Sequence, residues 1–335
     1  MVPTATLALL VGGFLVTVIL EAVVLMFAKR LQWFAHPNAR SSHTVATPTL
    51  GGVAFVLPVI IYLGLTASYE LPAVVGLLIG TTLVAVAGLW DDARELKPSS
   101  RLAAHAAAIG IVLWYLPLDW PWWMMAPIVF VLVWHINLYN FMDGIDGIAS
   151  SQCLLFCLGV LYLTGGVPGW LGDLLWILVG TALGFLVYNW PPAKIFMGDV
   201  GSGALGLILG VVTLQLAISG MLPFIGCLIL LTGFWFDASY TLCVRMLSGQ
   251  AFTEAHRSHL YQKVAARIGQ NVASRNGHLW STVIFLAFGL AWLLPMASFA
   301  VAFPDYGLLF QLVAILPMGI AAWRLRAGYP EPEDT

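Results

Sequence analysis

Five short segments of the chain combine carboxylates, amides, basic side chains and glycines in patterns that could hold a metal ion or a phosphate. The first is the adjacent pair Asp91 and Asp92, placed where an apolar run ends. Two like charges at a helix C-terminus repel each other and the negative end of the helix dipole, so a cation should compensate them. Arg94 and Lys97 are near enough in sequence to do so, and a bound divalent ion is the alternative.

The second segment places a polar residue at every third position: Asn137, Asn140, Asp143 and Asp146. In a regular α-helix such residues fan out by about 60° per step, whereas a helix that loosens at Gly144 would converge them on one pocket. Two amides and two carboxylates are the hard oxygen ligands that suit Mg²⁺ bound to substrate phosphates. Solvated polar groups at a helix end are the alternative interpretation.

The third segment sets Asp199 among glycines at the start of an apolar run, ten residues after Asn189. A glycine-flanked acid that opens a helix is typical of a phosphate-binding turn, because free backbone N–H groups point at the ligand. No Lys-Ser or Lys-Thr pair follows, which excludes a Walker P-loop. Asp199 is therefore a candidate metal ligand.

The remaining segments are basic. Arg40 and His43 precede a glycine pair in an early polar loop and could contact phosphate. His256, Arg257 and His259 occur in the longest polar stretch, and the residues after them alternate between apolar and basic at helical spacing. That pattern predicts a short amphipathic helix at the membrane surface.

The composition of the chain predicts the kind of fold that positions these segments. The 335 residues are 60% hydrophobic and 9% charged, with a mean hydropathy of +0.92, too little polar surface for a water-soluble globule. Backbone polar groups find no water in hydrocarbon and the runs lack barrel alternation, so helices are predicted. The chain is expected to be an all-α polytopic integral membrane protein, a single membrane-embedded domain of residues 1–335. About 11 transmembrane helices correspond to the runs 5–27, 51–67, 71–90, 102–117, 122–139, 152–165, 170–187, 203–219, 222–244, 279–300 and 306–323.

The orientation of the chain in the membrane is predicted from the distribution of its basic residues. All 14 Lys and Arg fall in connections on one side of these runs, while acids and tryptophans occupy the other. The positive-inside rule makes the basic side cytoplasmic, with the N-terminus outside and the C-terminus inside. Residues 245–278 form a cytoplasmic loop that holds the amphipathic helix, and 324–335 a flexible cytoplasmic tail. The first run is expected to be a retained anchor. The four cysteines lie in apolar runs and are expected to be small buried hydrophobes.

With these segments in order, the chain resembles the polyprenyl-phosphate N-acetylhexosamine-1-phosphate transferases, a glycosyltransferase family 4 type that includes phospho-N-acetylmuramoyl-pentapeptide transferase. The resemblance spans roughly residues 36–265. The segments 137–147, 196–202 and 255–262 are especially similar to the branch that initiates O-antigen and related surface-polysaccharide chains.

The resemblance implies transfer of a sugar 1-phosphate from a UDP-N-acetylhexosamine to undecaprenyl phosphate, with release of UMP, at the cytoplasmic face of the bacterial inner membrane. It implies Mg²⁺ as cofactor, with Mn²⁺ as a substitute. Catalytic roles fall to Asp91, Asp92 and Asp199, and metal binding to Asp199 and Asp92. The candidate substrate-binding residues are Arg40, His43, Asn137, Asn140, Asp143, Asp146, Asn189, His256, Arg257 and His259.

Alternatives remain. His36 stands where the family has an aspartate, and Arg257 and Ser258 replace consecutive histidines of the muropeptide branch, which argues against a muropeptide substrate. A CDP-alcohol phosphotransferase fits only the opening of its motif. A membrane transporter would use the intramembrane acids Glu21 and Asp237. No nucleic-acid partner is expected, and the sugar epimer and a homodimer are left open.

Overall fold

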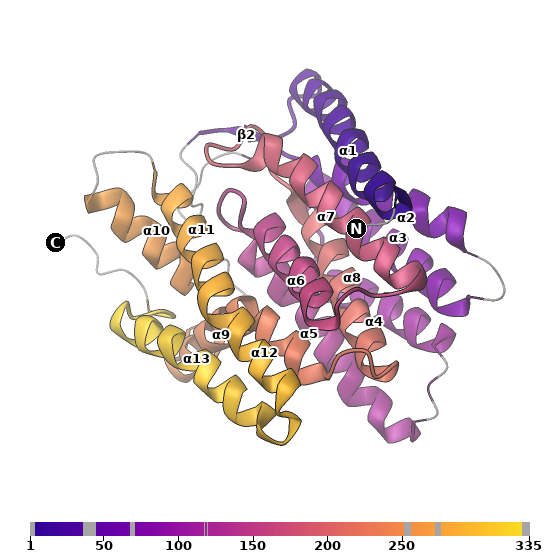
Figure 1. Ribbon diagram of the computed structural model, residues 1–335. Helices are drawn as coiled ribbons and strands as arrows, with labels where there is room; N and C mark the ends of the chain where they lie inside the picture. The colour runs from indigo at the N-terminus through magenta and orange to yellow at the C-terminus, as the bar shows by residue number, and fades with distance from the viewer. Residues whose placement is uncertain are drawn as a thin grey trace.

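The computed structural model describes residues 4–35, 45–67, 71–116, 118, 120–250, 256–271 and 276–329, apart from the side chains of residues 122 and 271. Most of this described chain is helical (Figure 1). Its elements, in order, are α1 (Thr4–Arg30), β1 (Phe34–Ala35), β2 (Thr47–Pro48), α2 (Gly51–Thr66), α3 (Pro72–Arg94), α4 (Pro98–Tyr115), η1 (Trp122–Met124), α5 (Met125–Met142), α6 (Ile148–Thr164), α7 (Gly169–Asn189), α8 (Gly198–Ile218), α9 (Phe224–Leu247), α10 (Leu260–Asn271), α11 (Gly277–Phe288), η2 (Gly289–Leu293), α12 (Leu294–Ala302), η3 (Pro304–Tyr306) and α13 (Gly307–Arg324). The two short strands pair antiparallel, with Phe34 opposite Pro48.

Eight helices of the described chain are long and apolar enough to cross a membrane: α1, α3, α5, α7, α8, α9, the continuous helix from α11 through η2 to α12, and η3 with α13. Helices α2 and α6 are apolar but shorter, and α4 covers the remaining predicted run. The prediction of an all-α polytopic membrane protein is confirmed. Each predicted apolar run falls in a helix, while the number eleven and the outward N-terminus stay predictions.

Helix α8 forms the centre of the bundle. In its most apolar window 83% of residues are buried inside the protein, against 17% for α1, although both windows are strongly apolar. A helix that is apolar all round is expected in a core, where protein rather than lipid covers it. Helices α2, α3 and α5 pack against α8 (Figure 1). The acid at its first turn is therefore surrounded by the ends of several other helices.

Glycines let two of these helices approach the start of α8 at backbone distance. A Cβ on Gly52 of α2 would lie 2.4 Å from the backbone nitrogen of Gly201, and one on Gly88 of α3 would lie 2.5 Å from the carbonyl oxygen of Asp199. Only glycine allows contacts this close without a shift of the backbone. The close packing of α3 against α8 brings Asp92 beside Asp199.

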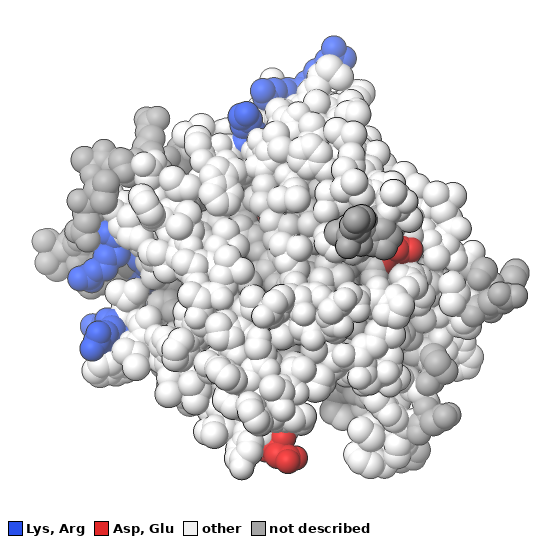
Figure 2. Space-filling view, viewed as in Figure 1, with Lys and Arg blue, Asp and Glu red and all other residues white. Residues whose placement is uncertain are grey.

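Charged side chains avoid the broad sides of the molecule. Figure 2 shows Lys and Arg atoms at the upper and left margins of the visible face and acidic atoms elsewhere, with a wide white surface between them. Exposed apolar side chains such as Leu15, Ile19 and Leu312 lie on the transmembrane helices. Such a surface suits hydrocarbon rather than water.

The two intramembrane acids differ in their surroundings. Both oxygens of Asp237 on α9 accept hydrogen bonds from the start of α10, from Leu260 N at 2.7 Å and Tyr261 N at 2.9 Å. Asp237 therefore caps a helix. Glu21 on α1 is fully buried, and neither of its carboxyl oxygens has a hydrogen-bond partner among the described residues.

The cysteine prediction holds for three of the four residues. Cys153, Cys157 and Cys227 are buried in the bundle. The prediction is wrong for Cys243, which is exposed. Cys243 lies near the end of α9, where Met246 and Leu247 are exposed as well.

Candidate active site

A polar cavity of about 310 Å³ lies where α3, α5 and α8 meet. Its walls come from segments far apart in the sequence. The described residues that line it are Ala35, Thr49, Asp92, Asn140, Asp143, Gly144, Ile145, Asp146, Asn189, Phe196, Met197, Gly198, Asp199, Ser202, Gln262 and His278. Eight of these sixteen residues carry a carboxylate, a carboxamide or an imidazole, a concentration that is rare inside a membrane protein and typical of a functional site.

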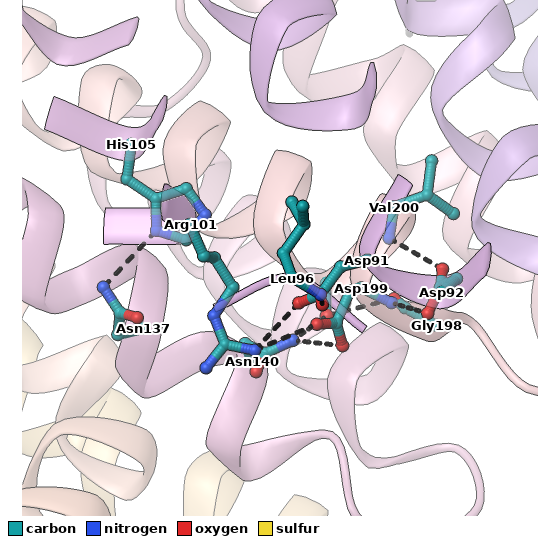
Figure 3. Close-up of polar contacts among 11 residues, drawn as sticks. Asp91, Asp92, Leu96, Arg101, His105, Asn137, Asn140, Gly198, Asp199 and Val200 are labelled. Atoms are coloured by element: carbon teal, nitrogen blue, oxygen red, sulfur yellow. Dashed lines mark hydrogen bonds and ion pairs between the residues drawn. The ribbon is translucent and has the colours of Figure 1, made fainter. Parts of the chain in front are cut away.

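Asp92 caps the N-terminus of α8. Its Oδ1 accepts a hydrogen bond from Asp199 N at 3.0 Å and its Oδ2 accepts one from Val200 N at 3.2 Å (Figure 3). A carboxylate satisfies the free N–H groups of a first helical turn and complements the positive end of its dipole. Gly198 has a φ of 71°, and a Cβ there would lie 2.6 Å from Asp92 Oδ2. The glycine before Asp199 is therefore required for this cap.

The cation beside the acidic pair is Arg101, not Arg94 or Lys97. Arg101 Nη1 lies 3.0 Å from Asp91 Oδ2 and 3.3 Å from Asp199 Oδ2, so it bridges two carboxylates (Figure 3). The Arg94 guanidinium instead lies over the Trp90 ring, 5.9 Å from its centre. Helix α4 turns back directly after α3, which brings its first turn to the carboxyl end of α3. Sequence spacing alone favoured the nearer cations.

Asn140 and Asn137 point in different directions. Asn140 Nδ2 donates to Asp199 Oδ1 at 2.8 Å and to Ser202 Oγ at 3.0 Å. Asn137 does not line the cavity; its Nδ2 donates to Val133 O at 2.8 Å and lies 3.4 Å from His105 Nδ1. Helix α5 stays regular to Met142, so the fan of side chains persists up to that point. Only the polar residues near and beyond its end converge.

Asp143 and Asp146 follow the end of α5 and line the cavity. Burial, together with the negative charges of Asp199, Asp92 and Asp146, raises the pKa of Asp143 well above its usual range. A cation that enters the cavity would offset this shift and favour the ionised form of Asp143.

Asp146 and Asn189 link the loop between α5 and α6 to the segment that follows α7. Asp146 Oδ2 accepts a hydrogen bond from Ala193 N at 2.9 Å. Asn189 accepts one from Gly147 N at 2.9 Å and donates one to Ile195 O at 2.8 Å. Both side chains border the cavity, but much of their bonding capacity is used to fix the floor of the cavity.

The described residues that line the cavity do not include His256, Arg257 or His259. His259 is buried, with Nδ1 3.5 Å from Asp237 Oδ1. Burial, then the neighbouring His259 and Arg245, lowers the pKa of His256 to about 3, so this ring is neutral near pH 7. The role of His256, Arg257 and His259 in substrate binding stays a prediction. Arg257 is exposed.

The sequence predicted no role in the site for four polar residues at or beside the cavity: Arg101, Ser202, Gln262 and His278. The signal for Arg101 was its position in the first turn after a short reversal. Ser202 lies one helical turn after Gly198, whose carbonyl its hydroxyl contacts at 3.0 Å. Gln262 ends the segment 255–262 that resembles the family, whereas His278 lies in no such segment. The predicted residues Arg40 and His43, and His36, lie outside the described residues.

The donor set fits a hard divalent cation. Asp199 and Asp143 supply carboxylate oxygens at one cavity, and Asn140 and Ser202 adjoin Asp199. Within the described chain no three His, Cys, Asp or Glu side chains already form a metal cluster. Mg²⁺ usually keeps several waters and is held by one or two carboxylates plus substrate phosphates, so the carboxylates of Asp199 and Asp143 are the candidate ligands. Asp92 lines the same cavity, and its two oxygens accept backbone hydrogen bonds from α8; its role as a metal ligand stays a prediction.

Comparison with known proteins adds an independent finding. Residues 74–217 match the glycosyl transferase family 4 domain. The chain is 34% identical to a phospho-N-acetylmuramoyl-pentapeptide-transferase of Moorella thermoacetica over 65% of this chain and 77% of that protein. It is 28% identical to a probable undecaprenyl-phosphate N-acetylglucosaminyl 1-phosphate transferase of Bacillus subtilis over 75% of each chain. A phospho-N-acetylmuramoyl-pentapeptide-transferase of Gloeothece citriformis is 34% identical, and there the match spans little more than half, 57%, of that relative.

Proposed function

This chain belongs to glycosyl transferase family 4, and from that premise we propose that it transfers an N-acetylhexosamine 1-phosphate from a UDP-sugar to undecaprenyl phosphate. The products are polyprenyl-diphosphate sugar and UMP, and the reaction begins the synthesis of O-antigen or another surface polysaccharide. The observation that carries the proposal is the cavity in which Asp92, Asp143 and Asp199 meet from three separate segments.

The position of the same cavity supports a reaction at the cytoplasmic face of the membrane. The cavity lies at the ends of helices where the basic residues of the sequence fall, and the positive-inside rule makes that side cytoplasmic. UDP-sugars are water-soluble and the acceptor is a membrane lipid. A site at the cytoplasmic face of the bacterial inner membrane gives both substrates access.

Direct in-line attack by the acceptor phosphate is the mechanism that these residues support best. A phosphate monoester has a second pKa of about 6, so the acceptor is already mostly dianionic at neutral pH and needs no strong base. The acceptor oxygen forms a bond to the sugar-linked phosphorus while the bond from that phosphorus to the oxygen of UMP breaks. UMP leaves with that electron pair.

The chain's own residues position the metal ligands and offset the repulsion between neighbouring negative charges. Asp199 and Asp143 would hold Mg²⁺, which when bound supplies positive charge to the diphosphate. Asp92 fixes the first turn of α8 and thereby Asp199, and of the adjacent acids it is the one that lines the cavity. Arg101 holds Asp199 and Asp91 in place and offsets their repulsion.

A phospho-aspartyl intermediate is the mechanistic alternative. It would break the donor bond before the lipid binds, so UMP would appear in stoichiometric amount without undecaprenyl phosphate. We expect no such release in a single-turnover experiment. Its detection would replace direct attack by covalent catalysis.

The substrate branch rests on the basic segment. Arg257 and Ser258 replace the consecutive histidines that the muropeptide branch has, which supports an N-acetylhexosamine donor. Peptidoglycan precursor transfer is the second candidate, because two of the relatives above carry that name.

One assay tests the proposal. Purified protein in detergent receives undecaprenyl phosphate, Mg²⁺ and one donor from a panel of UDP-N-acetylhexosamines and UDP-N-acetylmuramoyl-pentapeptide, and UMP and lipid-linked sugar are measured. We expect turnover with at least one N-acetylhexosamine donor. Turnover with the muropeptide alone would assign the second candidate, and no UMP from any donor would reject the proposal.

A further inference from the structure

One wall of the cavity carries two polar residues for which the sequence predicted no role in the site. It is formed by Gln262 of α10 and His278 of α11, two helices that pack against each other. The opposite walls carry four carboxylates: Asp92, Asp143, Asp146 and Asp199. Among the lining residues that the structure describes, His278 is the only one whose side chain can carry positive charge.

This composition creates an electrostatic problem for an anionic ligand. Like charges within a few ångströms of one another strongly oppose ionisation, and the effect grows in a cavity with low-dielectric walls. A diphosphate that enters among four carboxylates therefore needs donors and positive charge. His278 is placed to supply them from the protein.

The imidazole of His278 is held in a fixed orientation. Its Nδ1 lies 3.1 Å from Asp146 Oδ1, while Asp146 Oδ2 accepts a hydrogen bond from Ala193 N at 2.9 Å. The carbonyl oxygen of Asp146 accepts a further hydrogen bond from Thr282 Oγ1, also at 2.9 Å. Asp146 is only 8% exposed. It is therefore an anchor tied to α11 and to the loop after α7, rather than a ligand that can turn toward a substrate.

The contact with Asp146 involves one particular nitrogen of the ring, Nδ1. A carboxylate beside Nδ1 places a proton on that nitrogen, and the second ring nitrogen, Nε2, lies on the opposite edge of the ring. Negative charge on both sides of the ring, from Asp146 and from a bound diphosphate, favours the imidazolium form, which donates from Nδ1 to Asp146 and from Nε2 to a phosphate oxygen. Bonds of this kind, between charged groups, are about twice as strong as neutral ones.

We propose that His278 is a donor-binding residue that hydrogen-bonds the diphosphate of a nucleotide-sugar in this cavity, with Asp146 as the residue that orients its ring. The inference rests on the proposed function and adds a contact from the α10–α11 helix pair, outside the acidic motifs. The chemical class of the ligand is a nucleoside diphosphate.

The experiment compares His278→Gln with Trp280→Phe. Trp280 lies on the same helix, is about half exposed and does not line the cavity, so its variant is a matched control. UDP binding is measured by calorimetry on the full chain in detergent with Mg²⁺, alongside the KM for donor and acceptor. For His278→Gln we expect roughly tenfold weaker UDP binding and a roughly tenfold higher donor KM, the effect of one lost charge-assisted hydrogen bond, with the acceptor KM unchanged.

A second variant keeps the test sound if His278→Gln unfolds. Asp146→Asn retains one oxygen to accept from Nδ1 and should weaken UDP binding less than His278→Gln does. UDP affinity within twofold of wild type for a folded His278→Gln or His278→Asn protein would overturn the inference, and so would an equal loss in Trp280→Phe. Because UDP binding needs no turnover, it reports on His278 even if no UDP-sugar proves to be a substrate.

Discussion

Replacing Asp92 with asparagine tests how the cavity is built. Asp92 accepts two backbone hydrogen bonds, from Asp199 N at 3.0 Å and Val200 N at 3.2 Å. An asparagine keeps one oxygen, and its NH₂ group would face an N–H donor. The variant thus loses one of the two cap bonds and the negative charge at the helix N-terminus.

The magnitude follows from these losses. Removing a helix cap costs about 0.5–2 kcal/mol, and a hydrogen bond to a charged group contributes about 1.5–3 kcal/mol. We expect a loss near 1–3 kcal/mol, shared between the stability of the fold and the placement of Asp199. If the share of this free energy that goes into misplacing Asp199 is also lost from the stabilisation of the transition state, kcat/KM falls about ten- to hundredfold, since each 1.4 kcal/mol is a factor of ten.

The assay measures UMP release at saturating acceptor together with the thermal unfolding midpoint in detergent. Residual product above background and a lowered midpoint are expected. Asn140→Asp is a useful companion variant, because it perturbs Asp199 from the other side without touching the cap. Activity within threefold of wild type would refute the capping argument. A complete loss of activity with an unchanged midpoint would make Asp92 a chemical participant instead.

Four further outcomes are expected. Excess EDTA should stop UMP release and added Mg²⁺ or Mn²⁺ should restore it, because clustered carboxylates otherwise repel a diphosphate; a full rate in EDTA would contradict this. Asp199→Asn should abolish turnover at an unchanged unfolding midpoint, and a rate within about threefold, less than roughly 1 kcal/mol, would remove it from the metal site. Asp143 has a pKa raised by burial and nearby acids, so its contribution to stability is complete below the unfolded pKa of about 3.9 and is lost as pH rises through the folded pKa. In EDTA, Asp143→Asn should therefore unfold at a higher temperature than wild type at pH 8, and the difference in unfolding temperature should shrink toward acidic pH. A difference that does not change with pH would show that the pKa of Asp143 is not raised by folding. Asp237→Asn should lower the unfolding midpoint by the equivalent of about 0.5–2 kcal/mol and expose α10 to protease, because one of two capping bonds is lost; equal protease resistance would contradict it.

The sequence was sufficient for the membrane helices and for the glycine-flanked acid at the start of α8. Hydrophobic runs report burial in lipid or in the bundle, and both favour a helix because backbone groups must pair within it. Asp199 was recognisable because the glycines around it and the apolar run after it are local signals. Its role in metal binding stays a prediction.

Contacts between distant segments could not be derived in the same way. Arg101 follows Asp91 by ten residues, and its pairing depends on how tightly α4 reverses on α3. Asp237 was interpreted as an intramembrane charge, since the sequence of α9 contains no signal that the first turn of α10 packs against this side chain. His278 has no motif around it, and only the packing of α11 beside the loop after α5 brings it to Asp146. Each of these pairs is a product of tertiary packing.

The cavity also carries a consequence for biogenesis. Asp92, Asn140, Asp199 and His278 come from helices that enter the membrane one after another during synthesis, and at about 5–20 residues per second roughly 10–40 s separate the first from the last. Until α8 arrives, the acids at the end of α3 have no helix to cap, and until α11 arrives Asp146 lacks its imidazole. A ribosome-bound chain arrested before α11 would hold most of the carboxylates without their histidine partner. Catalytic competence should therefore emerge abruptly with the last helices rather than accumulate with chain length.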